Sequence, residues 1–402
     1  MKPNPAIVCL LVLATALPSA ALQTFTVDGS VDRPDVSVGD GVCEAVFFQD
    51  TFCSLRAAIQ ESNAAGGGAT IFVPAGTYTL SLVGVGPDSP TVGDLDITAP
   101  VSILGTGGVA VIDAQDIDRV VHVAVTQPPN VVFSFVDLVG GDADDGAGDG
   151  GGLYVEDGAV TFTDGAVRGN RASRGGGIFT EAEGSVLLDR ASIRDNLAVF
   201  GGGIYGSGLI RRSEIVNNDA GTGPAARARS GRSLSILHST ISANTGAPGA
   251  IYCSSTRIDL TSTTVHDNEG AALAVEGSCE LNPESSILSG GCSAIPGLLA
   301  DFGDNLESPG DSCGLSPMMN LLSVGDPGLK PLAYYGGPTR SHALKSDSLA
   351  RDFSSTCSEA DQREAPRSSP NCDTGALEYG ATSPLPGIFA DGFESGDSAA
   401  WQ

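Results

Sequence analysis

The sequence is poor in aromatic residues and in lysine. Aromatic side chains make up only 5% of the 402 residues, and the chain holds three lysines and one tryptophan. Sugar-binding grooves commonly use aromatic rings as stacking platforms, so this low content argues against such a groove. The scarcity of cations and the net charge of −27 disfavour binding to nucleic acid or to anionic lipid. We therefore expect no nucleic-acid partner.

The mature sequence also lacks a long hydrophobic run. No stretch after the N-terminus is apolar for the roughly 18 residues that a membrane-spanning helix needs. The N-terminus itself differs, because Lys2 precedes an apolar run from Ala6 to Leu17, with small residues at positions 19 and 21. This pattern predicts a signal peptide over residues 1–21. We expect an exported monomer without a transmembrane segment, either secreted to the extracellular medium or held at the cell surface.

Cysteine is present in an even number once Cys9 is removed with the signal peptide. The eight remaining cysteines favour disulfides in an exported chain, and no C-x-x-C pair or histidine cluster suggests zinc or redox chemistry. Eight cysteines allow on the order of a hundred connectivities. Pairing each cysteine with its sequence neighbour predicts four bonds: Cys43–Cys53, Cys253–Cys279, Cys292–Cys313 and Cys357–Cys372.

The most informative feature of the chain is a sequence repeat of 22 to 26 residues. A hydrophobic anchor stands three places before an asparagine five times, and these asparagines are 26, 22, 26 and 24 residues apart. Another apolar residue stands five places before each anchor, and only small residues stand two places before it. A repeat of this length is typical of solenoids. The anchors are Val167, Ile193, Ile215, Ile241 and Val265.

The spacing within each repeat indicates strands. Apolar residues two apart follow the strand period, and the five-residue step to the anchor requires a bend between two strands. A coil of about 24 residues cannot bury its own apolar face, so the coils must stack. The sequence therefore predicts an all-β fold, a right-handed parallel β-helix, with room for a third strand in each coil. A leucine-rich repeat is the competing solenoid, but its L-x-x-L-x-L motif is absent.

Two residue types mark the expected corners of the coils. We expect the asparagines to adopt the left-handed conformation of a sharp corner and to hydrogen-bond from coil to coil. The glycine triplets of GGGLY (150–154), GGGIF (175–179) and GGGIY (201–205) are expected at the opposite corner. There, a positive φ or a close backbone approach would penalise a Cβ.

The flanking regions have different compositions. The segment SLRAAIQESNAA (54–65) predicts a short helix that caps the open end of the stack, next to strands at 70–80 and 101–112. We divide the mature chain into a cap with the first coils, the β-helix repeats, an irregular cysteine-stapled region, and an acidic tail that is a candidate sorting label. These parts span residues 22–130, 131–294, 295–380 and 381–402.

Three families share motifs with this chain. CSLRAAIQESNA (53–64), GTYTL (76–80) and GDLDI (93–97) resemble the CSLREA domain of secreted bacterial β-helix proteins, with Ala57 in place of its glutamate. The C-terminal segments resemble a choice-of-anchor Q domain, and the repeats are similar to those of polymorphic outer-membrane adhesins. The resemblance implies export and a β-helix fold. The C-terminal segments are DPGLKPLAYYGGPTRSHAL (326–344), DQRE (361–364) and CDTGALE (372–378).

The acidic loop GDADDGAGDGGG (141–152) is the candidate metal site. Asp142, Asp144, Asp145 and Asp149 offer the oxygen ligands that Ca²⁺ prefers. Their spacing matches neither the EF-hand nor the calcium-binding nonapeptide, and a solvated turn is the alternative interpretation. No cofactor is required by the sequence, and calcium is the possible ligand.

The outward positions after the anchors bear on function. They change character from coil to coil, which suits an extended contact surface better than an active site. We expect a scaffold without catalytic residues that binds a cell-surface, matrix or glycan partner. The alternative is a calcium-dependent polysaccharide lyase with Arg168 or Arg194 as its base, so enzymatic activity stays open. The outward residues are Arg168, Arg194, Val216, Ser242 and His266.

Two further groups of polar residues suggest structure more than catalysis. The histidines, at positions 122, 238, 266 and 342, stand isolated in the sequence. Five of the charged residues between Cys357 and the end of the cysteine-stapled region, at residue 380, predict a structural cluster of ion pairs, which we call the charged knot. They are Asp361, Arg363, Arg367, Asp373 and Glu378.

Overall fold

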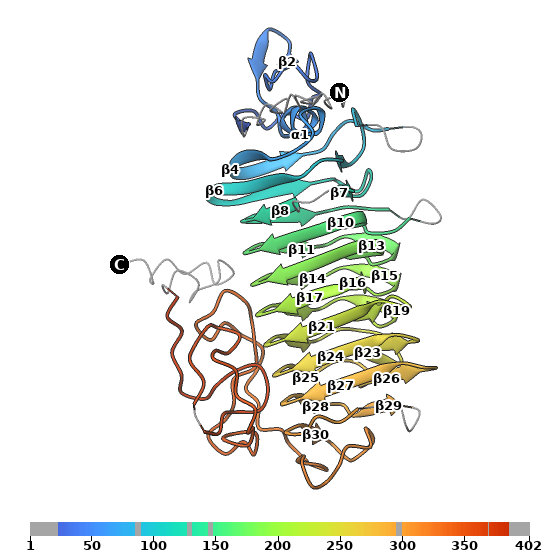
Figure 1. Cartoon of the computed structure of the whole chain (residues 1–402), viewed down its shortest axis with the longest axis vertical. Coiled ribbons are helices and arrows are strands. Elements are labelled where there is room, and N and C mark those ends of the chain that lie inside the picture. Colours follow the sequence, from blue (N-terminus) through green and yellow to red (C-terminus); the bar gives the residue numbers. More distant parts are fainter. Residues whose placement is uncertain are drawn as a thin grey trace, which may run out of the picture.

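The chain folds into stacked coils along one axis (Figure 1). The structure is a computed structural model and describes residues 23–84, 90–126, 131–143, 148–294, 300–368 and 370–385. The predicted signal peptide, the aspartates at 144 and 145, and the tail beyond residue 385 lie outside these residues. The described part is an all-β right-handed parallel β-helix, as the repeat predicts.

Each coil contributes one strand to each of three parallel sheets. The first sheet contains β5 (Leu95–Ile97), β7 (Val121–Ala124), the first part of β10 (Leu153–Thr163) and of β13 (Ile178–Asp189), β16 (Ile204–Gly206), β20 (Ala226–Ala228), β23 (Gly249–Ser254), β26 (Ala271–Glu276) and β29 (Cys292–Ala294). The second contains β1 (Thr24–Thr26), the first parts of β4 (Ala69–Thr79) and β6 (Val101–Asp113), β8 (Val131–Ser134), the later parts of β10 and β13, β17 (Gly208–Arg211), β21 (Ser233–Leu237), β24 (Arg257–Thr261) and β27 (Glu280–Glu284).

The third sheet carries the anchors. It contains the later parts of β4 and β6, then β9 (Val136–Val139), β11 (Ala166–Arg168), β14 (Ser192–Arg194), β18 (Glu214–Val216), β22 (Thr240–Ser242), β25 (Thr264–His266), β28 (Ile287–Ser289) and β30 (Leu306–Ser308). The parallel register places each anchor directly on the next, and all five are fully buried. This result confirms the predicted core column. A short fourth strand follows the asparagine in three coils: β12 (Arg171–Arg174), β15 (Leu197–Phe200) and β19 (Asp219–Thr222).

The asparagines form a continuous ladder of amides inside their corner. Asn196 accepts from the backbone N–H of Asn170 at 3.0 Å, and its own amide donates to Asn218 at 2.9 Å. The ladder continues through Asn244 to Asn268. The predicted left-handed conformation of these asparagines is wrong, because the preceding residue adopts the positive φ instead. The left-handed residues are Gly169, Asp195, Asn217, Ala243 and Asp267.

The glycine triplets lie at a corner, as predicted, but not at one opposite the asparagines, because a Cβ on Gly177 would lie 2.8 Å from the amide nitrogen of Asn196. Gly175 has a φ of +62°, a conformation that favours glycine. A Cβ on Gly177 would lie 2.6 Å from the carbonyl oxygen of Gly203 in the next coil. Only a residue without a side chain allows the coils to approach this closely.

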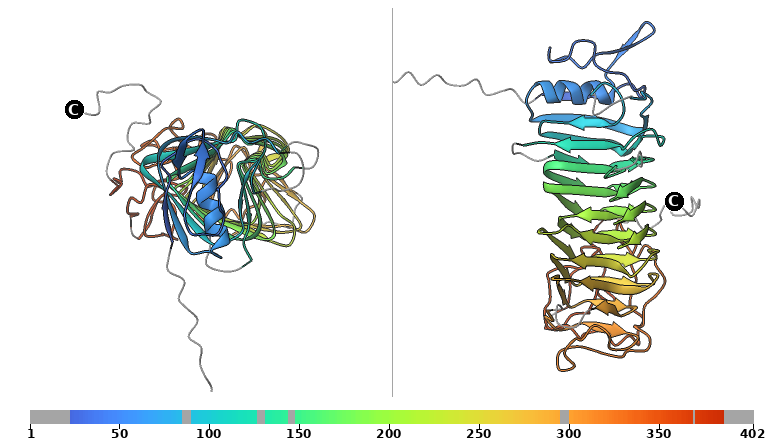
Figure 2. Two further views of the ribbon diagram at one scale, coloured as in Figure 1. Left: turned by 90° about the horizontal axis from the view of Figure 1, so that it is seen from above. Right: turned by 90° about the vertical axis from the view of Figure 1, so that its right-hand side faces the viewer.

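A helix closes the N-terminal end of the stack. The helix α1 (Leu55–Ala64) begins at the N-cap Ser54, whose hydroxyl accepts from the N–H of Ala57 at 3.0 Å. It lies across the end of the coils (Figure 2), where it contacts β4 and β5. This agrees with the predicted cap. A hairpin of β2 (Ala45–Phe47) and β3 (Asp50–Phe52) precedes it.

The four predicted disulfides are present. The Cα atoms of the paired cysteines lie 5.1, 5.8, 4.8 and 5.7 Å apart in chain order, which is the usual range for a disulfide. Among the described residues, no helix is long and apolar enough to cross a membrane.

The C-terminal region runs back beside the lower coils (Figure 1) and covers the outer face of the third sheet. Arg340 pairs with Glu214 at 3.0 Å, and the Oγ1 of Thr240 donates to Gln362 at 2.7 Å. Val216 and Ser242 are consequently fully buried. The expectation that these two positions form a solvent-facing surface is therefore wrong, because the C-terminal region packs over them.

The charged knot predicted in this region is also present. Arg363 pairs with Asp361 at 2.6 Å, and Arg367 approaches Glu378 at 3.7 Å. The carboxylate of Glu378 accepts from the N–H of Asp373. All five side chains are buried or nearly so, which fits a structural role.

Candidate functional site

The first seven strands of the first sheet each direct one polar or aromatic side chain outwards, and Ala274 of β26 takes the next position. Alternate residues of a strand point to opposite faces, so the inward Leu153, Ile178 and Ile204 are each followed by an outward ring. The parallel register lines these residues up from coil to coil. We call this set the outer column: Asp96, His122, Tyr154, Phe179, Tyr205, Arg227 and Tyr252.

The rings of the outer column stack on one another. The ring centroids of His122 and Tyr154 lie 4.9 Å apart with an interplanar angle of 12°, and those of Phe179 and Tyr205 lie 5.4 Å apart at 13°. In each of these two pairs, one ring covers part of the face of the other. Phe179 points away from the core and is nevertheless fully buried, because Arg174 lies over it at 4.8 Å from the centroid.

Two of the guanidinium groups along the outer column are neutralised by carboxylates. Arg174 binds Asp149 through two hydrogen bonds of 2.7 and 2.5 Å, and Arg229 pairs with Glu181 at 2.6 Å. Arg227 is different, because no described carboxylate pairs with it. Its guanidinium instead lies over three rings, at 4.6 Å from Tyr252, 4.8 Å from Phe200 and 5.4 Å from Tyr205.

An apolar strip lies beside Arg227. Strand β15 exposes Leu197, Val199 and Phe200 by 41%, 53% and 38% of their surfaces. Phe200 shares the guanidinium of Arg227 with the outer column, so the strip and the column are continuous. We call these three residues together with Tyr205, Arg227 and Tyr252 the β15 patch. Its mixture of aromatic, aliphatic and arginine side chains is typical of the centres of protein interfaces.

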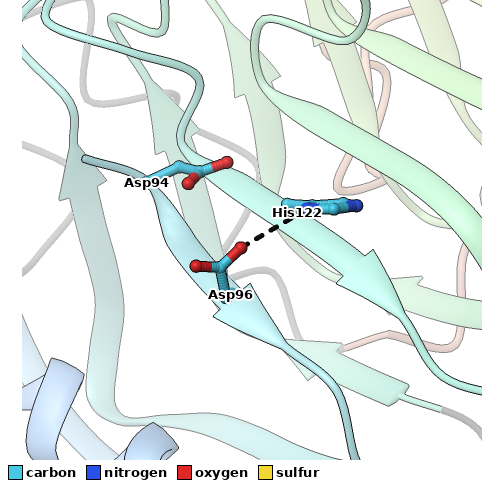
Figure 3. Close-up of side chains that lie close together, drawn as sticks. All are labelled: Asp94, Asp96 and His122. Carbon is cyan, nitrogen blue, oxygen red and sulfur yellow. Dashed lines mark ion pairs between the residues drawn. The ribbon is translucent and has the colours of Figure 1, made fainter. Parts of the chain in front are cut away.

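A cluster of two carboxylates and an imidazole begins the outer column (Figure 3). Leu95 and Ile97 point into the core from β5, so Asp94 and Asp96 point outwards on the same side of the strand. The register then sets His122 beside Asp96. One ligand atom from each of these residues lies within 4.8 Å of the other two.

The cluster carries more negative than positive charge. The Nδ1 of His122 lies 3.3 Å from an oxygen of Asp96, and its Nε2 lies 3.0 Å from Glu156. Arg119 lies 3.2 Å from Asp94. Burial lowers the pKa of His122, but the hydrogen bond to Asp96 and the charge of Asp94 outweigh it and raise the pKa overall. Burial, with the charges of Asp96 and Asp118, raises the pKa of Asp94 to about 7.

Two oxygens of the cluster are left without a hydrogen bond. The Oδ2 atoms of Asp94 and Asp96 are buried, and neither has a hydrogen-bond partner among the described residues, although Arg119 contacts the first of them electrostatically. A cavity of about 460 Å³ lies between α1 and the first sheet and reaches Asp96 and His122. The amide side chains of Gln60 and Asn63 also line it.

The acidic loop chosen from the sequence is only partly described. Asp149 is bound by Arg174, and the backbone of Asp142 forms a bridge to Arg171. The aspartates at 144 and 145 lie outside the described residues. Calcium binding by this loop therefore stays a prediction.

The residues proposed as lyase bases are paired. Arg168 lies 3.2 Å from Asp137, and Arg194 lies 2.7 Å from Asp195. The predicted isolation of the histidines is wrong for three of them. His122 belongs to the cluster, and the rings of His266 and His342 lie 4.8 Å apart.

The sequence did contain signals for the outer column that its analysis missed. Each glycine triplet is followed by an inward aliphatic residue and then by Tyr154, Phe179 or Tyr205. Likewise, the alternation in GDLDI (93–97) places two aspartates on one face of a strand.

Three comparisons with known proteins were made. The crystal structure of pectate lyase Pel9A is similar, with a TM-score of 0.45 and 14% sequence identity over 90% of this chain and 97% of that chain. No curated protein matches the sequence. The family described as "Right handed beta helix region" matches residues 148–305, which contain the stacked repeats.

Proposed function

We propose that this protein is a non-catalytic β-helix scaffold that binds another protein through the β15 patch. The observation that carries the proposal is the guanidinium of Arg227, which lies over three rings without a carboxylate from the described part of the chain. An arginine on a strongly acidic protein is normally neutralised, as Arg174 and Arg229 are. A partner carboxylate is the natural group to complete the hydrogen bonds of Arg227.

The apolar strip supports a protein over a glycan as the partner. Leu197, Val199 and Phe200 expose aliphatic and aromatic surface, which binds side chains of the same kind. Two pairs of rings in the outer column stack on one another, and Phe179 is fully buried. Sugars stack on open ring faces, and the outer column offers few of them.

The scaffold proposal competes with the calcium-dependent lyase. Arg168 and Arg194 are engaged by carboxylates, and the C-terminal region covers the third sheet below them. A lyase base needs an accessible group on a substrate-binding face. These contacts support the scaffold over the lyase.

Surface plasmon resonance tests the proposal. It measures the binding of this protein to a panel of purified extracellular matrix proteins, to pectate and to alginate. We expect at least one matrix protein to bind, and both Arg227→Ala and Phe200→Ala to weaken binding about tenfold or more, since hot-spot residues contribute ~1.4 kcal/mol or more. Arg257→Ala is the matched control, because Arg257 is paired with Asp259 on the second sheet.

Two results would contradict the scaffold. One is binding that the β15 substitutions leave unchanged. The other is calcium-dependent release of unsaturated uronides from pectate or alginate that Arg168→Ala abolishes, which would establish the lyase instead.

A further inference from the structure

We propose that Asp94, Asp96 and His122 bind a zinc ion, with an open coordination position that faces the cavity beside α1. The proposal concerns a site several coils away from the β15 patch and does not depend on the proposed partner binding. It rests on the convergence of three ligand atoms, on their buried and unsatisfied oxygens, and on the partner of the imidazole.

The backbone brings the three ligands together before any metal is bound. Asp94, directly before β5, and Asp96 within it lie on one side of the strand, and His122 is the register partner of Asp96 on β7. Arg56 of the buried cap donates to the carbonyl oxygens of Gly93 and Asp94, both at 2.7 Å, and so fixes the segment that carries the first ligand. Tyr154 stacks on the imidazole ring and limits its rotation.

The buried oxygens of the cluster have few partners: the Oδ2 of Asp94 contacts the guanidinium of Arg119 at 3.2 Å, and the Oδ2 of Asp96 has no hydrogen-bond partner among the described residues. Asp94 and Asp96 have side chains that are 3% and 9% exposed, and each leaves one buried oxygen without a hydrogen bond among the residues that the structure describes. Buried carboxylate oxygens ordinarily have partners, so each such atom needs an explanation. The carboxylates of Glu156 and Asp118 add negative charge nearby, and Arg119 offsets part of it.

Glu156 supplies the second contact that a metal-bound histidine requires. Its carboxylate lies 3.0 Å from Nε2 of His122, which leaves Nδ1 on the side of Asp96 as the ligand atom. Metal-bound histidines commonly donate their other N–H to a carboxylate, which orients the ring. On binding, the metal takes the Nδ1 lone pair, and any proton held there is released to solvent.

The ligand types select zinc over calcium. An imidazole nitrogen with two carboxylates suits zinc, whereas calcium takes six to eight oxygens. Tetrahedral zinc places its ligand atoms about 3.3 Å apart, so the present spacing of up to 4.8 Å requires the side chains to close by up to about 1.5 Å. Three protein ligands leave the fourth position for water, and the cavity that reaches Asp96 and His122 gives access to it.

Calorimetric titration of the chelator-treated full chain with Zn²⁺ tests the proposal. We expect one ion per chain, and at least tenfold weaker binding for Asp96→Asn and for His122→Asn. Asp259→Asn is the matched control, since the Asp259 carboxylate is paired with Arg257 on the second sheet. The affinity of this variant for Zn²⁺ should equal that of the wild type. Asp149→Asn tests the acidic loop as a competing site. Loss of binding in Asp149→Asn with unchanged binding in Asp96→Asn would overturn the proposal.

A second measurement uses the unaltered protein, in case the variants do not fold. The imidazole resonances of the four histidines are followed by NMR as Zn²⁺ is added. We expect a stoichiometric shift of one histidine, assigned to His122 by its contact with Tyr154. Absence of stoichiometric binding, or a shift of a different histidine, would contradict the zinc site.

Discussion

Asn218 stands in the middle of the amide ladder and is fully buried. It accepts from the N–H of Asn196 and donates to the carbonyl oxygen of Ile193, at 3.1 and 2.9 Å. Asn218→Ala leaves buried partners on both sides without a hydrogen bond. We expect the free energy of unfolding to fall by roughly 2–4 kcal/mol, measured by urea denaturation.

Asn268 provides the control for this prediction. It occupies the far end of the same ladder and is half-buried, so water can replace some of the hydrogen bonds that its amide makes. Asn268→Ala should therefore cost clearly less than Asn218→Ala. Equal losses for the two variants would show that the ladder does not stabilise the fold through its buried hydrogen bonds.

Individual residues also show how far the sequence could predict this structure. The anchors, the capping helix and the disulfides follow from local spacing, since each depends on the hydrophobic period or on the nearest cysteine. The left-handed conformation of Ala243 was not predictable in this way, because the ladder, not the residue itself, requires it. The His122 cluster depends on which strands become neighbours, and one sequence contains no direct record of that register.

At the scale of elements, a neutral histidine, His342, attaches the C-terminal region to the β-helix. His342 lies with its Nε2 2.9 Å from the Oγ of Ser242 and its Nδ1 2.7 Å from the carbonyl oxygen of Lys330. Burial lowers the pKa of His342 to about 4. Burial and the charge of Arg367 lower the pKa of His238 to about 4 as well. Both side chains are therefore neutral in the folded protein at pH 7.

This neutrality predicts acid sensitivity. Between about pH 6.5 and 4 the unfolded chain binds protons on these histidines that the folded chain does not, so stability is full above pH 6.5 and falls towards pH 4. Each histidine contributes at most about 3 kcal/mol to this fall. In urea denaturation, the double variant His238→Gln/His342→Gln should lose less stability than the wild type over this interval. Parallel losses in the two proteins would refute the assignment.

The capping helix depends on one buried ion pair. Arg56 is 2% exposed and lies 2.7 Å from Asp32, which also accepts from the N–H of Ser81 at 2.9 Å. Arg56→Ala leaves this carboxylate buried without its counter-charge, and we expect a loss of about 3–5 kcal/mol in thermal or urea unfolding. Arg33→Ala is the control, because Arg33 donates to the backbone oxygen of Asp32 and lies over the ring of Phe47, without an ion pair among the described residues. A similar loss in both variants would argue against the ion pair as the cause.

At the scale of the whole molecule, the anchor column joins all of the repeats. Ile215 lies at its centre, and Ile215→Asp places an unpaired charge in a dry interior. We expect this variant not to fold, or to lose more than about 4 kcal/mol of stability, as seen by circular dichroism. Leu209→Asp on the same coil is the control, because Leu209 points outwards and is half-buried. Wild-type-like melting of Ile215→Asp would exclude the observed register.

The fold-back of the C-terminal region has a consequence for the order in which the molecule can assemble. Its contacts with the third sheet join residues 100, 122 and 126 positions apart, whereas each coil contacts a neighbour about 24 residues away. The coils can therefore form one after another as the chain emerges, but the contacts of His342, Gln362 and Arg340 must wait until nearly all of it is available. Until that moment the face around Val216 stays bare, so the last step of folding is also the step that protects the nascent protein from self-association.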